Sequence, residues 1–227
     1  AAYFDGISYE HDGFGKRIKK NNIEFVYDSD GRLIKQSNGL EFIYDDKQVI
    51  ALEKAQIRYF YRRDVQGNII ALLDENGAVV VRYIYDAWGN HAVVDANGND
   101  IEDMSHIGNV NPFRYRGYYY DAETGLYYLQ TRYYDPETGR FISQDSIEYA
   151  APEAVNGLNL YAYCLNNPVM MTDETGTMPE WLKWVLGILI IVVAVGLSIV
   201  TMGLATPISA ALGGGLAGAI LGGAVAG

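Results

Sequence analysis

Carboxylates are the side chains of this sequence that could most readily do chemistry, and most of them stand in short turn-like patterns. Two acidic residues at a suitable distance could act as the general acid and base of a glycosidase. However, their positions shortly before a Gly already explain most of them as turn formers. The stretch 95–100 begins like a calcium loop, but Asp100 and His106 stand where a Gly and a bidentate Glu belong. We therefore predict a surface loop there and no metal site.

The thiol, imidazole and glycine patterns indicate no further reactive site. Cys164 is the only cysteine, which excludes a disulfide within the chain, and we expect it to be a small core residue. His11, His91 and His106 are spaced unlike pairs of zinc ligands. Glycines 213–215 are not followed by the Lys-Ser or Lys-Thr of a phosphate-binding loop. No cofactor is therefore predicted.

The elements that position these side chains follow from a repeat in the first part of the chain. Its clearest copy covers residues 27–33 and reads Tyr-Asp-Ser-Asp-Gly-Arg-Leu, and an earlier copy runs from Tyr9 to Gly13. Asp accepts a backbone hydrogen bond that starts a turn, and Gly adopts the positive φ that ends it. In front of the turn, Ile23 and Phe25 occupy alternate positions, as in a strand with one buried face.

Chained copies of this unit predict a continuous antiparallel sheet, which must curl or close to hide its edges. The 19 tyrosines and 25 glycines also favour an all-β composition. We predict a mainly β fold class over residues 1 to about 143, with tight turns between antiparallel strands. Because they end such turns, Gly31, Gly77 and Gly125 are expected to have positive φ.

Longer motifs carry a resemblance to a known family. These motifs are Gly-Asn-Ile-Ile-Ala-Leu-Leu-Asp-Glu-Asn-Gly at 67–77, Tyr-Ile-Tyr-Asp-Ala-Trp-Gly-Asn at 83–90, the tyrosine-rich run 111–145, and Asn-Leu-Tyr-Ala-Tyr-Cys-Leu-Asn-Asn-Pro-Val at 159–169. In this order, after Tyr-Asp-x-x-Gly-Arg-Leu units, they resemble the RHS/YD-repeat family and its RHS-associated core. The resemblance covers about residues 1–177.

The resemblance implies an organisation as well as a fold. It implies a YD-repeat sheet over residues 1–110 and the RHS-associated core over residues 111–177. In full-length relatives, a long spiral of β-strands encloses a C-terminal toxin, and the core closes one end of that shell. This organisation would imply a secreted or cell-surface bacterial protein. Its C-terminal effector would lie beyond Gly227 and be missing from this chain, and an immunity protein would act against that effector.

Many members of the family cut themselves at the end of the core with two aspartates and an arginine. By motif, Asp145 and Asp173 match the aspartates, Arg140 matches the arginine, and the scissile bond would follow Thr177. An ionised carboxylate could activate water while a protonated partner supplies a proton. Neither Asp-Pro-x-Gly motif is complete here, because Asp145 lacks both Pro and Gly and Asp173 lacks Pro. The alternative reading is that both aspartates only cap turns.

The end of the sequence differs in composition from the rest. No ionisable residue occurs from Trp184 to Gly227, and residues 184–206 form an apolar run long enough to span a bilayer. Pro207 interrupts it, and glycines 214, 218 and 222 recur along the second run. We therefore predict a third segment, 178–227, that forms an α-helical hydrophobic hairpin and inserts into a membrane through 184–227.

The net charge of the chain and the residues at its two ends restrict the classes of function that we expect. The net charge of −11 argues against a nucleic-acid partner, which would require a basic surface. Since the chain starts at Ala1 and ends inside an apolar run, we expect it to be part of a longer polypeptide. The favoured function is a structural and delivery module. Two alternatives stay open, namely a protease that cleaves itself once and a carbohydrate-binding or adhesive module that stacks sugars on its Tyr and Arg side chains.

Overall fold

A computed structural model describes residues 2–4, 6–46, 48–144, 159–173, 175 and 176. Within these residues, one antiparallel sheet contains eleven strands whose spatial order equals their order in the sequence. They are β1 (Ala2–Phe4), β2 (Ile7–His11), β3 (Arg17–Lys20), β4 (Ile23–Tyr27), β5 (Leu33–Gln36), β6 (Leu40–Tyr44), β7 (Val49–Lys54), β8 (Ile57–Arg63), β9 (Ile69–Leu73), β10 (Val79–Tyr85) and β11 (His91–Val94). The prediction of a mainly β fold is therefore confirmed.

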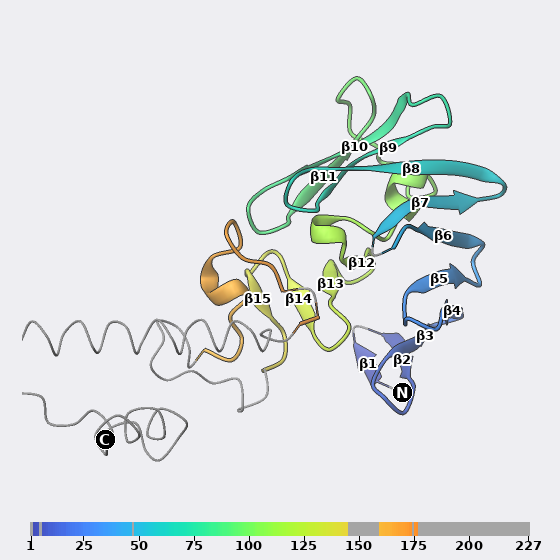
Figure 1. The fold of residues 1–227 in the computed structure, drawn as a ribbon. Helices are drawn as coiled ribbons and strands as arrows, with labels where there is room; N and C mark the ends of the chain where they lie inside the picture. Colours follow the sequence, from blue (N-terminus) through green and yellow to red (C-terminus); the bar gives the residue numbers. More distant parts are fainter. Residues whose placement is uncertain (1, 5, 47, 145–158, 174, 177–227) are drawn as a thin grey trace, which may run out of the picture. The chain divides into compact units, whose positions relative to one another are not determined.

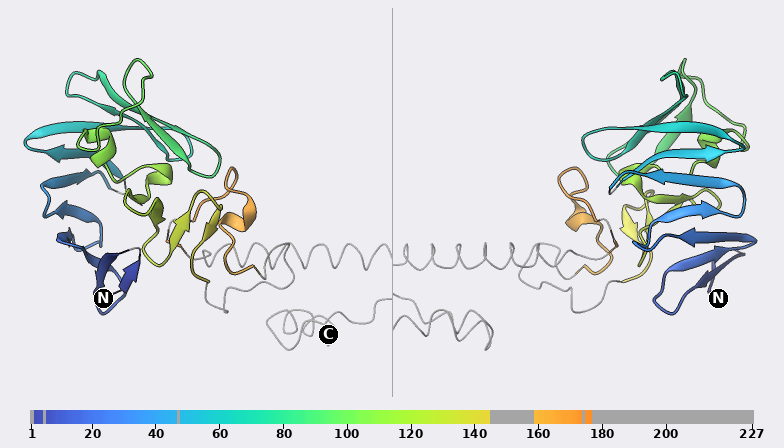
Figure 2. Two further views of the ribbon diagram at one scale, coloured as in Figure 1. Left: turned by 180° about the vertical axis from the view of Figure 1, so that it is seen from behind. Right: turned by 45° about the vertical axis from the view of Figure 1, so that its right-hand side comes forward.

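The sheet is curved, and its strand pairings contain the irregularities that bend a sheet. Figures 1 and 2 show the strands stacked in sequence order along a curved surface. Five of the strand pairings contain a register shift. In the β4–β5 pairing the shift falls between Val26 and Tyr27 of β4, and in the β6–β7 pairing it falls between Ile43 and Tyr44 of β6. Such bulges bend a strand and increase its twist. The predicted curling of the sheet thus has a local cause at several strand ends.

The turns between the strands have the geometry that the repeat predicts. The carboxylates of six aspartates each accept hydrogen bonds from the backbone N–H groups two and four residues later, and these are Asp12, Asp28, Asp64, Asp74, Asp86 and Asp95. The glycine three residues after each aspartate has a positive φ. Gly31, Gly77 and Gly125 have φ of 80°, 80° and 73°, as predicted. In the first turn this glycine is Gly15 rather than Gly13.

A second, smaller antiparallel sheet lies in the part of the chain from residue 111 onwards, which is called the core region below. It consists of β12 (Tyr119–Asp121), β13 (Leu126–Tyr128), β14 (Tyr133–Asp135) and β15 (Arg140–Phe141). Short helical turns precede and follow it, namely α1 (Ile107–Val110), η1 (Tyr115–Gly117) and η3 (Cys164–Asn166). Buried tyrosines fill its interior, where the rings of Tyr134 and Tyr163 have centroids 4.0 Å apart. Cys164 is buried in the same cluster, which confirms its prediction as a core residue.

The two sheets share a hydrophobic core. One cluster joins strand residues such as Phe25 and Leu52 to Phe113, Tyr119 and Tyr128 of the core region. The side chains of β6 alternate as the repeat predicts, since Leu40 and Phe42 are buried and Glu41 is exposed. Burial of one sheet face against the core supplies the hydrophobic stabilisation that a curved single-layer sheet lacks. Most tyrosines of the repeat and core are thereby used in packing.

The last part of the chain falls largely outside these residues. The chain divides into two compact units, residues 1–178 and residues 179–227. The predicted helical hairpin within 178–227, and with it the membrane prediction for 184–227, lies outside the described residues. Within the part of the chain that the structure describes, no helix is long and apolar enough to cross a membrane.

Candidate functional site

The junction between the repeat sheet and the core contains a buried ion cluster. The carboxylate of Asp121 on β12 accepts a hydrogen bond from Arg17 of β3, and its other oxygen lies 2.8 Å from Nζ of Lys20. Lys20 also lies 2.9 Å from the Glu123 carboxylate. Arg17, Lys20 and Asp121 are each at most 4 % exposed. Charges that deep in a protein are stable only when they are paired and hydrogen-bonded, so these residues depend on one another.

Aromatic rings complete the surroundings of Arg17. Its guanidinium lies 4.3 Å from the ring centroid of Tyr128, 4.6 Å from that of Tyr119 and 4.9 Å from that of Phe25. Burial acts to lower the pKa of Arg17, and the neighbouring Asp121 carboxylate outweighs it, so the pKa lies above its ordinary value. The cation therefore stays charged in an apolar environment and joins β3 to β12 and β13.

A second set of contacts fastens the β10–β11 turn to the core. Three tyrosine hydroxyls donate to three consecutive carbonyls of this turn: Tyr115 to Ala87 (2.9 Å), Tyr134 to Trp88 (2.7 Å) and Tyr127 to Gly89 (2.9 Å). A buried carbonyl that lacks a hydrogen-bond donor costs free energy. The three hydroxyls supply such donors to the carbonyl oxygens of the turn at the place where the turn meets the core.

His91 lies beside the same turn, against a cation. Nε2 of His91 contacts Nη1 of Arg114, and Nδ1 lies 3.1 Å from the Tyr127 hydroxyl. Burial and the Arg114 charge together lower the pKa of His91 to about 4. The imidazole is therefore neutral at pH 7, and its Nε2 accepts a hydrogen bond from Arg114. Arg114 also lies 4.6 Å from the ring centroid of Tyr120.

The structure describes two of the residues that the family resemblance assigns to self-cleavage, Asp173 and Arg140. Asp145 and Thr177 lie outside the described residues. Asp173 is 6 % exposed, and its carboxylate accepts a hydrogen bond of 2.9 Å from the backbone N–H of Gly176. Arg140 lies on the exposed face of β15, where its backbone pairs with Asp135. The roles of all three predicted catalytic residues stay predictions.

A different arginine lies at Asp173. Nη2 of Arg132 is 3.5 Å from an oxygen of the Asp173 carboxylate, and Nε of Arg132 donates to the carbonyl of Gly176. Thr131, next to it, donates from its hydroxyl to the Thr175 carbonyl at 2.6 Å. Arg132 is itself buried and lies against the Phe141 ring, 3.6 Å from the ring centroid. Arg132 thus holds the loop residues Asp173 and Gly176, which precede Thr177 in the sequence.

Sequence reasoning missed Arg132, although one signal was available. Between Arg116 and Arg140 it is the only Lys or Arg in a run rich in tyrosine. A lone cation in a segment that is otherwise buried must have partners, and the Asp173 carboxylate is one of them. Arg17, Lys20 and Asp121 were missed because their partners are far apart in the sequence.

The chemistry that the Arg132–Asp173 pair offers is limited to one carboxylate held beside a guanidinium. The pair lies at the chain segment that self-cleavage would cut.

A sequence-ordered, curved sheet of Asp-to-Gly hairpins, fastened to a tyrosine-rich core, defines the chain as a YD-repeat shell module. The sequence model of the Teneurin YD-shell family matches residues 37–169. The chain belongs to this family, and the resemblance to YD-repeat proteins is confirmed.

Relatives and solved structures agree with this assignment. The tRNA nuclease WapA of Bacillus subtilis is 35 % identical over 185 residues, which cover 74 % of this chain and 7 % of WapA. The toxin protein Tse5 of Pseudomonas aeruginosa is 33 % identical over 128 residues, covering 56 % of this chain and 8 % of Tse5. The crystal structure of TcdB2-TccC3-Cdc42 has the same fold over 75 % of this chain and 9 % of that chain, with a TM-score of 0.55 and 24 % identity. The chain thus spans less than a tenth of the length of these proteins.

Proposed function

We propose that this chain forms part of the wall and the closing core of a protein shell that encloses and delivers a C-terminal effector. The observation that carries the proposal is the buried cluster of Arg17, Lys20 and Asp121, which fastens one face of a curved sheet to the core. A wall built in this way has a covered inner face and consecutive strands that can continue around an enclosed space.

The relatives support the same proposal. WapA is named a tRNA nuclease and Tse5 a toxin protein, and both are far longer than the matching region. An effector attached to this chain would place it in a secreted or cell-surface bacterial protein, together with an immunity protein in the producing cell.

Limited proteolysis of the complete gene product tests enclosure. We expect the chain that follows residue 178 to be cut slowly in the wild-type protein and much faster in the Asp121→Asn variant, because that change loosens the fastening of wall to core. Glu123→Gln is the matched control, since Glu123 is 45 % exposed and only supplements the cluster. Equal cutting rates in all three proteins would contradict enclosure by this part of the wall.

We propose self-cleavage after Thr177 as a second function, because Asp173 and Arg132 hold the segment that leads to this bond. Asp145 and Asp173 would share the acid and base roles in the attack of water on the peptide carbonyl. Electrophoresis of the purified chain, followed by mass measurement, would reveal a fragment that ends at Thr177. Asp145→Asn and Asp173→Asn should each prevent it, while Asp74→Asn, in an exposed turn, should not. A wild-type chain that stays intact rules this function out.

We also propose that residues 184–227 serve delivery as a hydrophobic helical hairpin that inserts into a membrane. The support is the uncharged composition of the run, its length up to Thr206 and the break at Pro207.

A further inference from the structure

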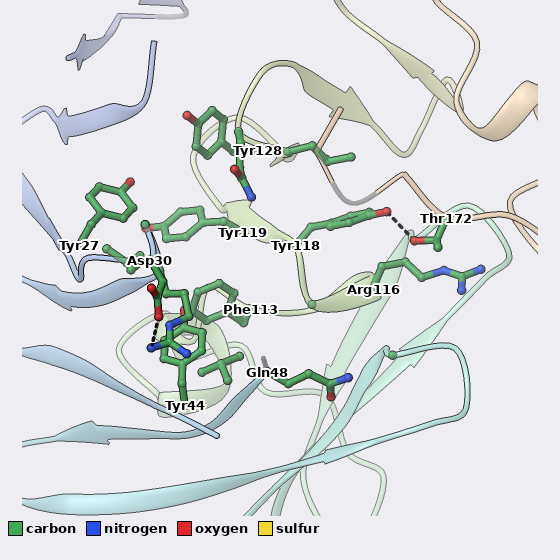
Figure 3. A pocket seen from close by; sticks show the side chains of 18 of the residues that line it. Tyr27, Asp30, Tyr44, Gln48, Phe113, Arg116, Tyr118, Tyr119, Tyr128 and Thr172 are labelled. Carbon is green, nitrogen blue, oxygen red and sulfur yellow. Dashed lines mark hydrogen bonds and ion pairs between the residues drawn. The ribbon is translucent and has the colours of Figure 1, made fainter. Parts of the chain in front are cut away.

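The face where the repeat sheet meets the core contains a cavity of about 630 Å³. This volume lies in the range of small-ligand pockets, roughly 300–1,000 Å³. The sheet contributes residues from Lys16, just before β3, to the β8–β9 turn. The core contributes residues from Phe113 to Gln130, together with Thr172. Figure 3 shows the labelled side chains from both regions around this space.

The charges that line the cavity are opposite in sign to the charge of the chain. Among the described residues that line the cavity, five are basic, namely Lys16, Arg17, Arg32, Arg63 and Arg116. Asp30 is the single acidic one among them, and its carboxylate lies 3.1 Å from the Arg32 guanidinium. A chain with a net charge of −11 therefore concentrates positive charge at one internal surface.

Three of these cations have no carboxylate partner among the described residues. Lys16 donates to the Gly31 carbonyl at 3.0 Å. Arg63 donates to the carbonyls of Gly67 (2.9 Å) and Val49 (2.8 Å), and Arg116 donates to those of Gln66 (3.0 Å) and Pro168. Backbone carbonyls hold these groups in position without neutralising them, so their charge remains available to an anion.

The remaining lining is aromatic. Phe113, Tyr119 and Tyr128 line the core side, and Phe25 and Tyr44 line the sheet side. Rings of this kind bind apolar and aromatic side chains, and arginine and tyrosine are enriched among the residues that dominate protein binding energies. A ligand that matches the cavity therefore carries both carboxylates and an apolar or aromatic group.

We propose that this cavity binds an acidic peptide segment, with its carboxylates at Arg63 and Arg116 and an apolar or aromatic side chain against Phe113 and Tyr119. A nucleic acid would also offer anions and rings, but the net charge of −11 repels a polyanion, whereas two or three carboxylates suffer much less repulsion. The proposal does not depend on the enclosure of an effector, because the chain itself can be tested for peptide binding.

Titration calorimetry with the full 227-residue chain, kept in nonionic detergent, tests the proposal. The probe is the capped tripeptide Glu-Phe-Glu, and the matched probe is Gln-Phe-Gln. We expect the acidic peptide to bind at least about tenfold more tightly, with an affinity that falls as salt increases, because charge-assisted hydrogen bonds carry the difference. Equal binding of the two peptides, or binding that salt leaves unchanged, overturns the proposal.

Variants locate the binding to this cavity. Arg116→Gln and Arg63→Gln should each weaken binding of the acidic peptide about tenfold, and Arg116→Lys should retain most of it because the charge remains. Arg62→Gln is the matched control, since Arg62 is exposed on the same strand as Arg63. If circular dichroism shows that Arg63→Gln does not fold, Arg116→Gln decides alone. An equal loss in Arg62→Gln, or tighter binding of a short single-stranded RNA than of the peptide, would show that the assignment is wrong.

Discussion

Asp121 neutralises Arg17 although 104 residues separate them, and both side chains are at most 1 % exposed. The pair joins the third strand of the repeat sheet to the first strand of the core. Because neither charge reaches solvent, each is stable in this position only while the other is present.

The first prediction follows from that dependence. Asp121→Asn leaves Arg17 and Lys20 buried without their shared carboxylate, and we expect it to reduce the free energy of unfolding by about 3–5 kcal/mol. Urea unfolding followed by circular dichroism measures the change. Glu123→Gln, which removes only the half-exposed partner of Lys20, should cost under about 1 kcal/mol. A loss of similar size in both variants would contradict a special role for Asp121.

The second prediction compares two turn glycines. Gly77 has a φ of 80° and open space around it, so Gly77→Ala should cost about 1 kcal/mol for the left-handed backbone alone. Gly139 has a φ of 66°, and a Cβ there would lie 2.8 Å from the Trp88 ring. Gly139→Ala should therefore cost about 3 kcal/mol, because steric overlap adds to the backbone strain. Thermal unfolding of the two variants distinguishes these cases, and equal losses would refute the contact with Trp88.

The third prediction concerns pH. The pKa of His91 lies near 4 in the folded chain and near its ordinary value of 6.5 in the unfolded chain. As the pH falls below 6.5, the unfolded state takes up the proton first, so folding stability decreases until the pH reaches about 4. The loss amounts to about 3 kcal/mol, since one pKa unit corresponds to about 1.4 kcal/mol.

Urea unfolding between pH 7.5 and pH 4 measures this loss. His91→Gln keeps an acceptor for Arg114 but cannot be protonated, and it should flatten the pH dependence in this window. His11 is exposed, so His11→Gln should leave most of the pH dependence unchanged. If His91→Gln and the wild-type chain lose stability in parallel, the buried neutral state of His91 is wrong.

The fourth prediction separates the two arginines near the end of the core. Arg132→Gln should release the segment 173–176, because Arg132 contacts both Asp173 and the Gly176 carbonyl. Hydrogen exchange measured by mass spectrometry should then be faster at Gly176, whose N–H donates to Asp173. Arg140→Gln should leave this exchange unchanged, since Arg140 lies on the exposed face of β15. The reverse pattern would favour Arg140 as the partner of this segment.

The fifth prediction tests the apolar tail. The full chain should partition into liposomes through residues 184–206, and Val193→Lys, in the middle of this run, should weaken insertion by about 3 kcal/mol. Flotation of the chain with liposomes measures the partition. Val26→Lys on the exposed side of β4 is the control and should change little. A wild-type chain that stays in the aqueous fraction would exclude the membrane role.

Local features of this fold were predictable from the sequence, and long-range ones were not. The turn at Asp28 and Gly31 follows from residues at most four positions apart, so the motif alone predicts its geometry. Asp121 stands in the same kind of motif, but its carboxylate does not accept the hydrogen bonds of the turn. Its backbone carbonyl accepts them from the N–H groups of Thr124 and Gly125, and its carboxylate pairs with Arg17 instead. No local pattern contains that information. Arg132 was missed for the same reason, since Asp173 lies 41 positions later.

The order of the strands has a kinetic consequence. Each strand from β2 to β11 pairs with the strand that precedes it, so the sheet has low contact order and can lengthen hairpin by hairpin as the chain emerges from a ribosome. The cations on β3, by contrast, must wait for about a hundred residues until Asp121 has been made. Until then their strand is held only by its neighbours. The sheet is therefore fixed to the core only after the core has been synthesised, when Asp121 can pair with Arg17 and Lys20.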